Sequence, residues 1–336
     1  MLPGMKSLLI AALAATALPA TILPATILSG TALALATPAA ETPKPTTPPA
    51  PGEIIAAAPA SDWADIAPSD LLVMTLAPDA GGKPRRVVIQ LMPPPFSQGW
   101  IGNIRQLAAA HWWDGTSINR VQDNYVTQWG DASEKKPLPG GLTTVPQSDY
   151  VATLPVSTRL SPVRPGDAYA PRNGFVRGWP VGAEPGARGV TRAWPVHCYG
   201  MVGVGRDLPP NTGTGAELYT VIGHAPRHLD RNIALVGRVI DGMSYLSSLP
   251  RGTGALGFYE TAGERVPIVS VRLGSDLAPA DQPHFQYLST ETASFLRYVE
   301  ARANRRDGFF IRPAGGADLC NLPVPVRVAG GGPSPK

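Results

Sequence analysis

The stretch GTSINRVQDNYVTQWGD, residues 115–131, decides the fold of this chain. Two pieces within it, residues 117–121 and 125–128, are rich in β-branched, aromatic and polar residues in the proportions typical of short strands. Arg120 lies near the end of the first piece and Gln128 ends the second. Asp131 follows Gly130, and a carboxylate at that place favours a turn. We therefore expect two neighbouring strands that carry Arg120 and Gln128.

Upstream of this stretch the pattern predicts a hairpin and a helix. Residues 71–76 (LLVMTL) and 86–91 (RVVIQL) are apolar and rich in β-branched residues, and the residues 79–82 between them (DAGG) favour a turn. Residues 100–110 (WIGNIRQLAAA) place apolar side chains on one face at helical spacing.

Downstream, short strand-like pieces alternate with turns. They cover residues 201–204, 218–222, 234–239 and 266–273, and residues 242–249 form a short helix before Pro250. Many short strands with two helices indicate a mainly β protein, a small closed barrel capped by the helices.

The residues around Arg120 and Gln128 resemble the signature of the cyclophilins, F-H-R-V-x-x-x-F-M-x-Q-x-G-D. Two later segments are similar to further cyclophilin motifs in the right order: Glu217-Leu218-Tyr219, and His228-Leu229-Asp230 leading to VGRVIDGM at residues 236–243. The resemblance covers about residues 69–275, with residues 132–197 poorly matched. It implies a closed antiparallel eight-stranded barrel capped by two helices, and peptidyl-prolyl cis–trans isomerase activity.

The resemblance also implies roles for individual residues. Arg120 matches the catalytic arginine that bonds the substrate carbonyl and the prolyl nitrogen, and Gln128 matches the glutamine that orients the substrate backbone. No cofactor or metal is implied, and the partners are proline-containing segments of unfolded or folding polypeptides. The expected substrate pocket consists of Tyr125, Val126, Glu217, Tyr219, His228, Leu229 and Ile233.

Four positions depart from the family pattern. Asn119 stands where the family has His, Val126 where it has Met, His228 where many members have Trp, and Ile233 where many have His. These departures make one pocket wall smaller or more polar. They favour an alternative function, a cyclophilin-like peptide-binding chaperone module with little or no catalysis.

Composition excludes several other classes. The chain has 336 residues with 36 Gly and 38 Pro, which disfavours a helical bundle, while 43% hydrophobic residues suffice for a core. The net charge is +4, and Arg305-Arg306 is the nearest approach to a basic run, so nucleic-acid binding has no support. His224 and His228 are four residues apart, but Pro226 between them indicates a loop rather than a metal-binding helix.

The N-terminus is typical of an export signal. Residues 1–36 combine Lys6, a long apolar run and the small-x-small exit Ala34-Leu35-Ala36. We expect a cleaved signal peptide and a periplasmic or secreted protein. The alternative is a retained membrane anchor facing the periplasm, and only then would the chain contact a membrane.

Four parts are expected along the chain. A signal peptide (1–36) precedes a Pro/Ala/Thr-rich linker (37–68) and the isomerase domain (69–275), which contains a long loop insert at 132–197. A C-terminal extension (276–336) carries a helix at about 290–306, capped by Ser289 or Thr290 and ended by Gly308. Cys198 and Cys320 are the only cysteines, and in an exported protein they are able to pair.

Overall fold

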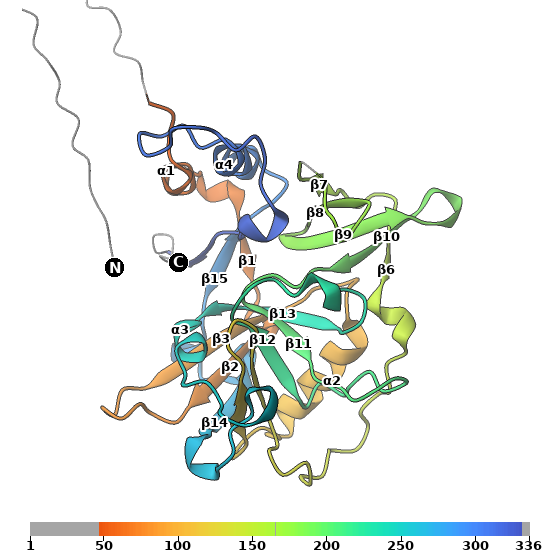
Figure 1. The fold of residues 1–336 in the computed structure, drawn as a ribbon, viewed down its shortest axis with the longest axis vertical. Helices are drawn as coiled ribbons and strands as arrows, with labels where there is room; N and C mark the ends of the chain where they lie inside the picture. The colour runs from red at the N-terminus through yellow and green to blue at the C-terminus, as the bar shows by residue number, and fades with distance from the viewer. Residues whose placement is uncertain (1–46, 165, 331–336) are drawn as a thin grey trace, which may run out of the picture. The chain divides into compact units, whose positions relative to one another are not determined.

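The structure is a computed structural model that describes residues 47–164 and 166–330. The expected signal peptide and the first part of the expected linker lie outside the described residues. Among the helices that are described, none has the length and apolar character needed to cross a membrane. Sixteen strands and four α-helices follow one another along the described chain (Figure 1).

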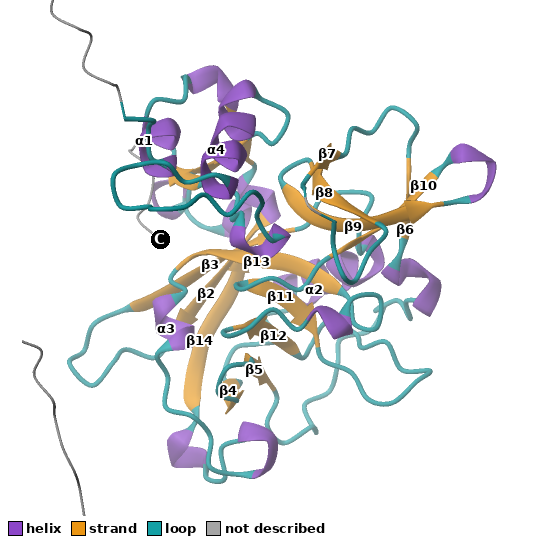
Figure 2. Cartoon of the chain, turned by 45° about the horizontal axis from the view of Figure 1, so that its top comes forward, coloured by secondary structure: helices purple, strands orange, loops and turns teal. Residues whose placement is uncertain are grey.

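Eight antiparallel strands close into a barrel, as the sequence predicted (Figure 2). Their order around the barrel is β11-β12-β5-β4-β14-β2-β3-β13, and β13 pairs with β11 to close it. Closure leaves no unpaired sheet edge. The barrel strands are β2 (Leu71–Leu76), β3 (Arg85–Leu91), β4 (Ser117–Val121), β5 (Val126–Gly130), β11 (Met201–Val204), β12 (Leu218–Val221), β13 (Leu235–Asp241) and β14 (Val266–Leu273).

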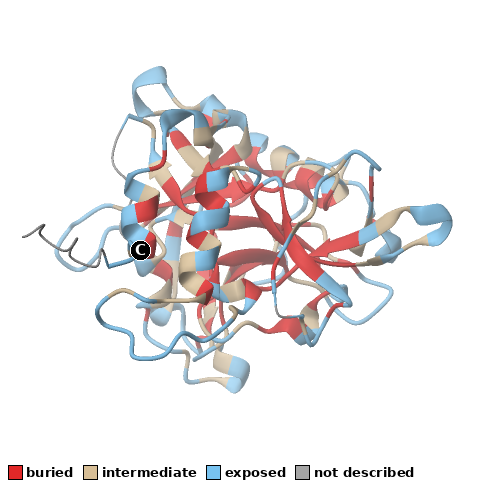
Figure 3. Cartoon of the chain, turned by 90° about the horizontal axis from the view of Figure 1, so that it is seen from above, coloured by how far each residue is buried: buried red, intermediate tan, exposed pale blue. Residues whose placement is uncertain are grey.

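The hairpin and the two helices of the barrel arise from local sequence. In the β2–β3 turn, Asp79 Oδ1 accepts hydrogen bonds from the backbone N–H groups of Gly81 and Lys83, both at 2.9 Å. Helix α2 (Gln98–Ala109) buries Trp100 and Leu107, which are completely inaccessible to solvent. Helix α3 (Ser244–Ser247) is a single turn that follows β13. Buried residues concentrate on the strands and on inward helix faces, whereas the connecting loops are exposed (Figure 3).

The insert forms a second sheet instead of the long loop that the sequence suggested. Its five strands lie in the order β6-β10-β9-β8-β7 around buried Phe175, Trp179 and Trp194. Most prolines of these strands lie at strand ends or on an edge strand, where a missing N–H is tolerated: Pro162 is on edge strand β7, and Pro185 and Pro195 end β9 and β10, while Pro180 is the second residue of β9. The strands are β6 (Ala152–Leu154), β7 (Ser161–Pro162), β8 (Arg172–Val176), β9 (Trp179–Pro185) and β10 (Thr191–Pro195).

The chain before the barrel and the C-terminal extension fold together into a third sheet. Strand β1 (Trp63–Ile66) pairs with β15 (Phe285–Leu288), which pairs with β16 (Val326–Val328). Helix α1 (Pro51–Ala56) lies beside α4 (Ala293–Ala303), as Figure 1 shows. Residues 51–66 are therefore not the extended linker that composition predicted, because Trp63 and Ile66 are buried.

Helix α4 is shorter than expected. Its N-cap is Thr292, whose Oγ1 accepts a hydrogen bond from the backbone N–H of Phe295 at 3.3 Å, rather than Ser289 or Thr290. A disulfide joins Cys198, just before β11, to Cys320 in the C-terminal extension. This bond ties the extension covalently to the segment that leads into β11.

Candidate active site

Arg120 and Gln128 are direct cross-strand partners on β4 and β5. The register between these strands shifts by one residue between Ile118 and Arg120, so Asn119 is an extra, buried residue on β4. Such a bulge re-aims the side chain that follows it. Arg120 Nη1 donates a hydrogen bond of 3.0 Å to Gln128 Oε1.

The Arg120 guanidinium is held on several sides. Its Nε donates to the carbonyl oxygen of Leu256 at 2.7 Å, and its Nη2 donates to Gln122 Oε1. The cation lies 5.7 Å from the ring centroid of Tyr125 and 5.3 Å from that of Phe258. Burial lowers the pKa of Arg120, but a guanidinium remains charged at neutral pH. Three of its five N–H groups are used within the protein, which leaves two for a ligand.

Glu217 extends the hydrogen-bonded pair of Arg120 and Gln128. We call these three side chains the polar row. Gln128 Nε2 donates to Glu217 Oε2 at 3.4 Å, so the amide is oriented by Arg120 at its oxygen and by the carboxylate at its nitrogen. The carboxylate lies over Gly130, where a Cβ atom would come within 1.9 Å of Glu217 Oε1. Burial raises the pKa of Glu217 to about 7.

An apolar cluster lies on the same outer face of the barrel as the polar row. Val126, Tyr219 and Val221 form a buried group separate from the main core, and Tyr125 and Ile233 pack against it. Val126 and Gln128 are two residues apart on β5. Glu217, which precedes β12, and Tyr219 on β12 are also two residues apart. Because side chains alternate between the two faces of a strand, each pair places one apolar and one polar side chain on the outer face. Tyr219 and Gln128 are paired across β12 and β5. The arrangement places a fixed cation and amide next to an apolar surface.

Two of the expected pocket residues are not part of the apolar cluster. His228 is exposed on the 3-10 turn Arg227–Leu229, and Leu229 is half-buried on the same turn; neither belongs to the apolar cluster. The sequence also gave no indication of Phe258 at the guanidinium. Phe258 follows a Gly-rich loop with no periodicity, so only the bridge between Phe258 and Arg120 in three dimensions identifies it.

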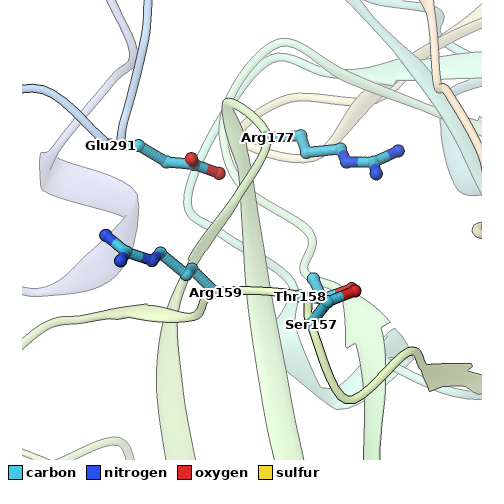
Figure 4. Close-up of a pocket in the computed structure, with 5 residues that line it drawn as sticks. All are labelled: Ser157, Thr158, Arg159, Arg177 and Glu291. Carbon is cyan, nitrogen blue, oxygen red and sulfur yellow. The ribbon is translucent and has the colours of Figure 1, made fainter.

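A separate cavity lies away from this face and includes none of its residues. It has a volume of about 310 Å³ and lies between the insert and the C-terminal extension (Figure 4). It is lined by Ser157, Thr158, Arg159, Arg177 and Glu291. Within residues 47–164 and 166–330, no three His, Cys, Asp or Glu side chains are grouped so as to hold a metal ion.

Comparisons with known proteins identify the family. Residues 97–273, more than half of the chain, match the model of the family described as cyclophilin type peptidyl-prolyl cis-trans isomerase/CLD. The chain is similar in structure to the cyclophilin AquaCyp293 from Hirschia baltica, with a TM-score of 0.61 and 23% identity over 78% of this chain and 91% of that one. This likeness supports the fold.

A second solved structure is less similar. A cyclophilin type peptidyl-prolyl cis-trans isomerase from Cryptosporidium parvum, crystallised in the presence of the dipeptide Ala-Pro, matches with a TM-score of 0.35 and 10% identity over 60% of this chain and 98% of that one. A search of curated proteins found no match. The family match confirms the enzyme class that the sequence predicted: the chain belongs to the cyclophilin-type peptidyl-prolyl cis–trans isomerases.

Proposed function

We propose that this protein catalyses rotation about Xaa-Pro bonds at the face formed by Arg120, Gln128 and the apolar cluster. The observation that carries the proposal is the hydrogen-bonded Arg120–Gln128 pair beside Val126 and Tyr219 on one barrel face. An amide is planar through resonance, with a rotation barrier of about 18–20 kcal/mol. Because no bond breaks, catalysis requires only that the twisted amide be stabilised more than the planar one.

Each group has a defined task in this mechanism. As the amide twists, resonance is lost and the prolyl nitrogen becomes basic, so a fixed cation beside it lowers the barrier. Arg120 supplies that charge through its two remaining N–H groups, and its hydrogen bonds to Leu256 and Gln128 limit reorganisation. The apolar cluster holds the proline ring. Each 1.4 kcal/mol of extra stabilisation of the twisted state gives about a tenfold rate increase.

The substrates that we propose are extended Xaa-Pro segments of exported proteins during their folding. The support is the signal-like sequence of residues 1–36, the small-residue exit before Thr37, and the Cys198–Cys320 disulfide, a bond that persists in oxidising compartments. A periplasmic or secreted location follows from cleavage, and a membrane-anchored protein facing the periplasm follows from retention. The N-terminal sequence of the mature protein, isolated from an envelope fraction, distinguishes the two.

A protease-coupled isomerase assay on a Xaa-Pro peptide tests the activity. The panel is the wild type, Arg120→Ala, Gln128→Ala and the control Arg192→Ala, whose exposed guanidinium pairs with Glu184 in the insert sheet. We expect Arg192→Ala to match the wild type, Gln128→Ala to lose part of kcat/KM and Arg120→Ala to lose most of it. An Arg120→Ala variant that is folded and as fast as the wild type overturns the assignment.

A second candidate function is peptide binding with little catalysis. The observation that favours it is the five-stranded insert sheet, a surface that the barrel does not need for its own closure. Binding of the same peptide without acceleration of exchange by the wild type would favour this chaperone function over the isomerase.

A further inference from the structure

A buried hydrogen-bonded network of polar side chains lies directly behind the apolar cluster. Tyr219 Oη lies 2.9 Å from His197 Nε2, and His197 Nδ1 lies 2.9 Å from Asp230 Oδ1. Arg227 then bridges two carboxylates: its Nε donates to Asp230 Oδ2 and its Nη2 to Asp167 Oδ2, both at 2.6 Å. His197 is completely buried, and Tyr219, Arg227 and Asp230 each expose only 5% of their surface.

The hydrogen-bond partners fix where the protons lie in this network. A carboxylate only accepts, so His197 Nδ1 carries the proton and donates to Asp230, while the backbone N–H of His197 donates to the same oxygen. Burial lowers the pKa of His197 and raises the pKa of Tyr219 well above its ordinary value. The imidazole is therefore neutral, and its Nε2 accepts the hydrogen bond that the Tyr219 hydroxyl donates.

The ring of Tyr219 is held as firmly as its hydroxyl. It is nearly parallel to the imidazole of His197, with an interplanar angle of 10° and a centroid distance of 6.4 Å. It lies across Gly203, its partner on β11, where a Cβ atom would come within 2.3 Å of Tyr219 Cζ and Oη. The missing side chain at Gly203 makes the space that the ring occupies.

The burial of this network excludes a role for Tyr219 or His197 as a nucleophile or base, because neither the hydroxyl nor the imidazole is accessible to a ligand. A different role follows from the place of Tyr219 in the apolar cluster. A tyrosine side chain that is free to change its rotamer would bring its polar, hydrated hydroxyl into an apolar surface. Hydrogen bonding to a fixed acceptor in the wall keeps it out.

We propose that His197 is a positioning residue that holds the Tyr219 hydroxyl in the wall, so that Tyr219 presents only its ring to the proline of the substrate. Asp230, Arg227 and Asp167 hold His197 in turn. The proposal rests on the proposed isomerase function and extends it to specificity. It also gives the insert a task, since Asp167 belongs to the insert and His197 ends it.

The disulfide also helps to hold His197 in place. Cys198 is the residue after His197, and Cys320 Sγ lies 3.8 Å from the His197 carbonyl oxygen. The C-terminal extension thus packs against the backbone of His197, and the covalent bond limits how far that backbone moves from Tyr219.

Enzyme kinetics on a double-mutant cycle test the proposal. His197→Ala is expected to raise KM about 5-fold or more with kcat within 2-fold, because the reacting amide still meets Arg120. Tyr219→Phe keeps the ring without the hydroxyl, so in that background His197→Ala is expected to change KM less than 2-fold. The control His284→Ala, an exposed histidine before β15, should match the wild type.

Equal effects of His197→Ala with and without the Tyr219 hydroxyl, or an unchanged KM, overturn the proposal. Nitrogen-15 NMR of the histidines in the wild type gives a second test that does not depend on a folded variant. We expect His197 to show a protonated Nδ1 and an unprotonated Nε2 at pH 7, and the opposite tautomer or an imidazolium overturns the proposal. A wild type that lacks isomerase activity, by contrast, overturns the proposed function, and the tautomer result stands apart from it.

Discussion

The partly buried carboxyl of Glu217 makes the stability of this protein depend on pH in an unusual direction. Its pKa is raised from 4.5 to about 7, chiefly because burial penalises the charged form, and Glu134 and Asp131 add repulsion. Between these two pH values the folded state keeps the proton and the unfolded state has lost it. Stability therefore falls as pH rises through this range and levels off above about pH 7.

The size of the effect follows from the two pKa values. At 1.36 kcal/mol per pKa unit, a rise from 4.5 to about 7 corresponds to a penalty of about 3 kcal/mol above pH 7. Glu217→Gln keeps an oxygen that accepts from Gln128 Nε2 and removes the charge. We expect the stability of the variant relative to the wild type to rise by about 3 kcal/mol between pH 4, where both states of the wild type keep the proton, and pH 8.

Urea unfolding of both proteins at each pH, with the disulfide intact, measures this difference. The difference between the two proteins isolates Glu217 from every other group that titrates over the same range. Glu300→Gln, an exposed position on α4, is the control and should give a curve parallel to that of the wild type. Parallel curves for Glu217→Gln and the wild type would refute the burial of a protonated carboxyl beside Gln128.

Three further changes test other parts of the account. Gly203→Ala places a Cβ atom 2.3 Å from Tyr219 Oη; we expect a loss of about 1–3 kcal/mol in urea unfolding and a higher KM. Replacing Cys198 and Cys320 by serine opens a crosslink across 122 residues, and calorimetry should show a loss of about 2–5 kcal/mol, whereas an unchanged Tm would contradict a structural bond. Phe258→Ala removes the ring 5.3 Å from the Arg120 guanidinium, so kcat/KM should fall about 2- to 5-fold, and no fall would exclude that contact from the proposed mechanism.

Local pattern predicted the barrel better than the parts around it. The β2–β3 hairpin and α2 have strong signals, since β-branched runs flank a turn in one and helical spacing marks the other. The pairing of β1 with β15 has no local signal, because more than 200 residues separate Asp65 from Gln286. The insert sheet was hidden by prolines, which are counted as breakers although edge strands and strand ends tolerate them.

The candidate site also contains some residues that were predicted from the sequence and others that were not. The family resemblance implied that Arg120, Gln128 and Tyr219 share one site, and the structure places them on β4, β5 and β12, which are neighbouring strands. His197 and Phe258 approach the site from the insert and from the loop before β14, where no spacing relates them to the motif. Glu217 was placed by position alone, and its raised pKa depends on burial and on the neighbouring charges of Glu134 and Asp131, which only the structure shows.

The central claim is that Arg120 stabilises the twisted amide rather than the bound peptide. NMR exchange spectroscopy of a Xaa-Pro peptide at saturating protein tests this claim most directly, because it measures cis–trans exchange in the bound state and binding in one experiment. We predict fast exchange with the wild type, and for Arg120→Ala a similar Kd with exchange slowed at least 100-fold. Bound-state exchange that stays fast in a folded Arg120→Ala variant would contradict the account.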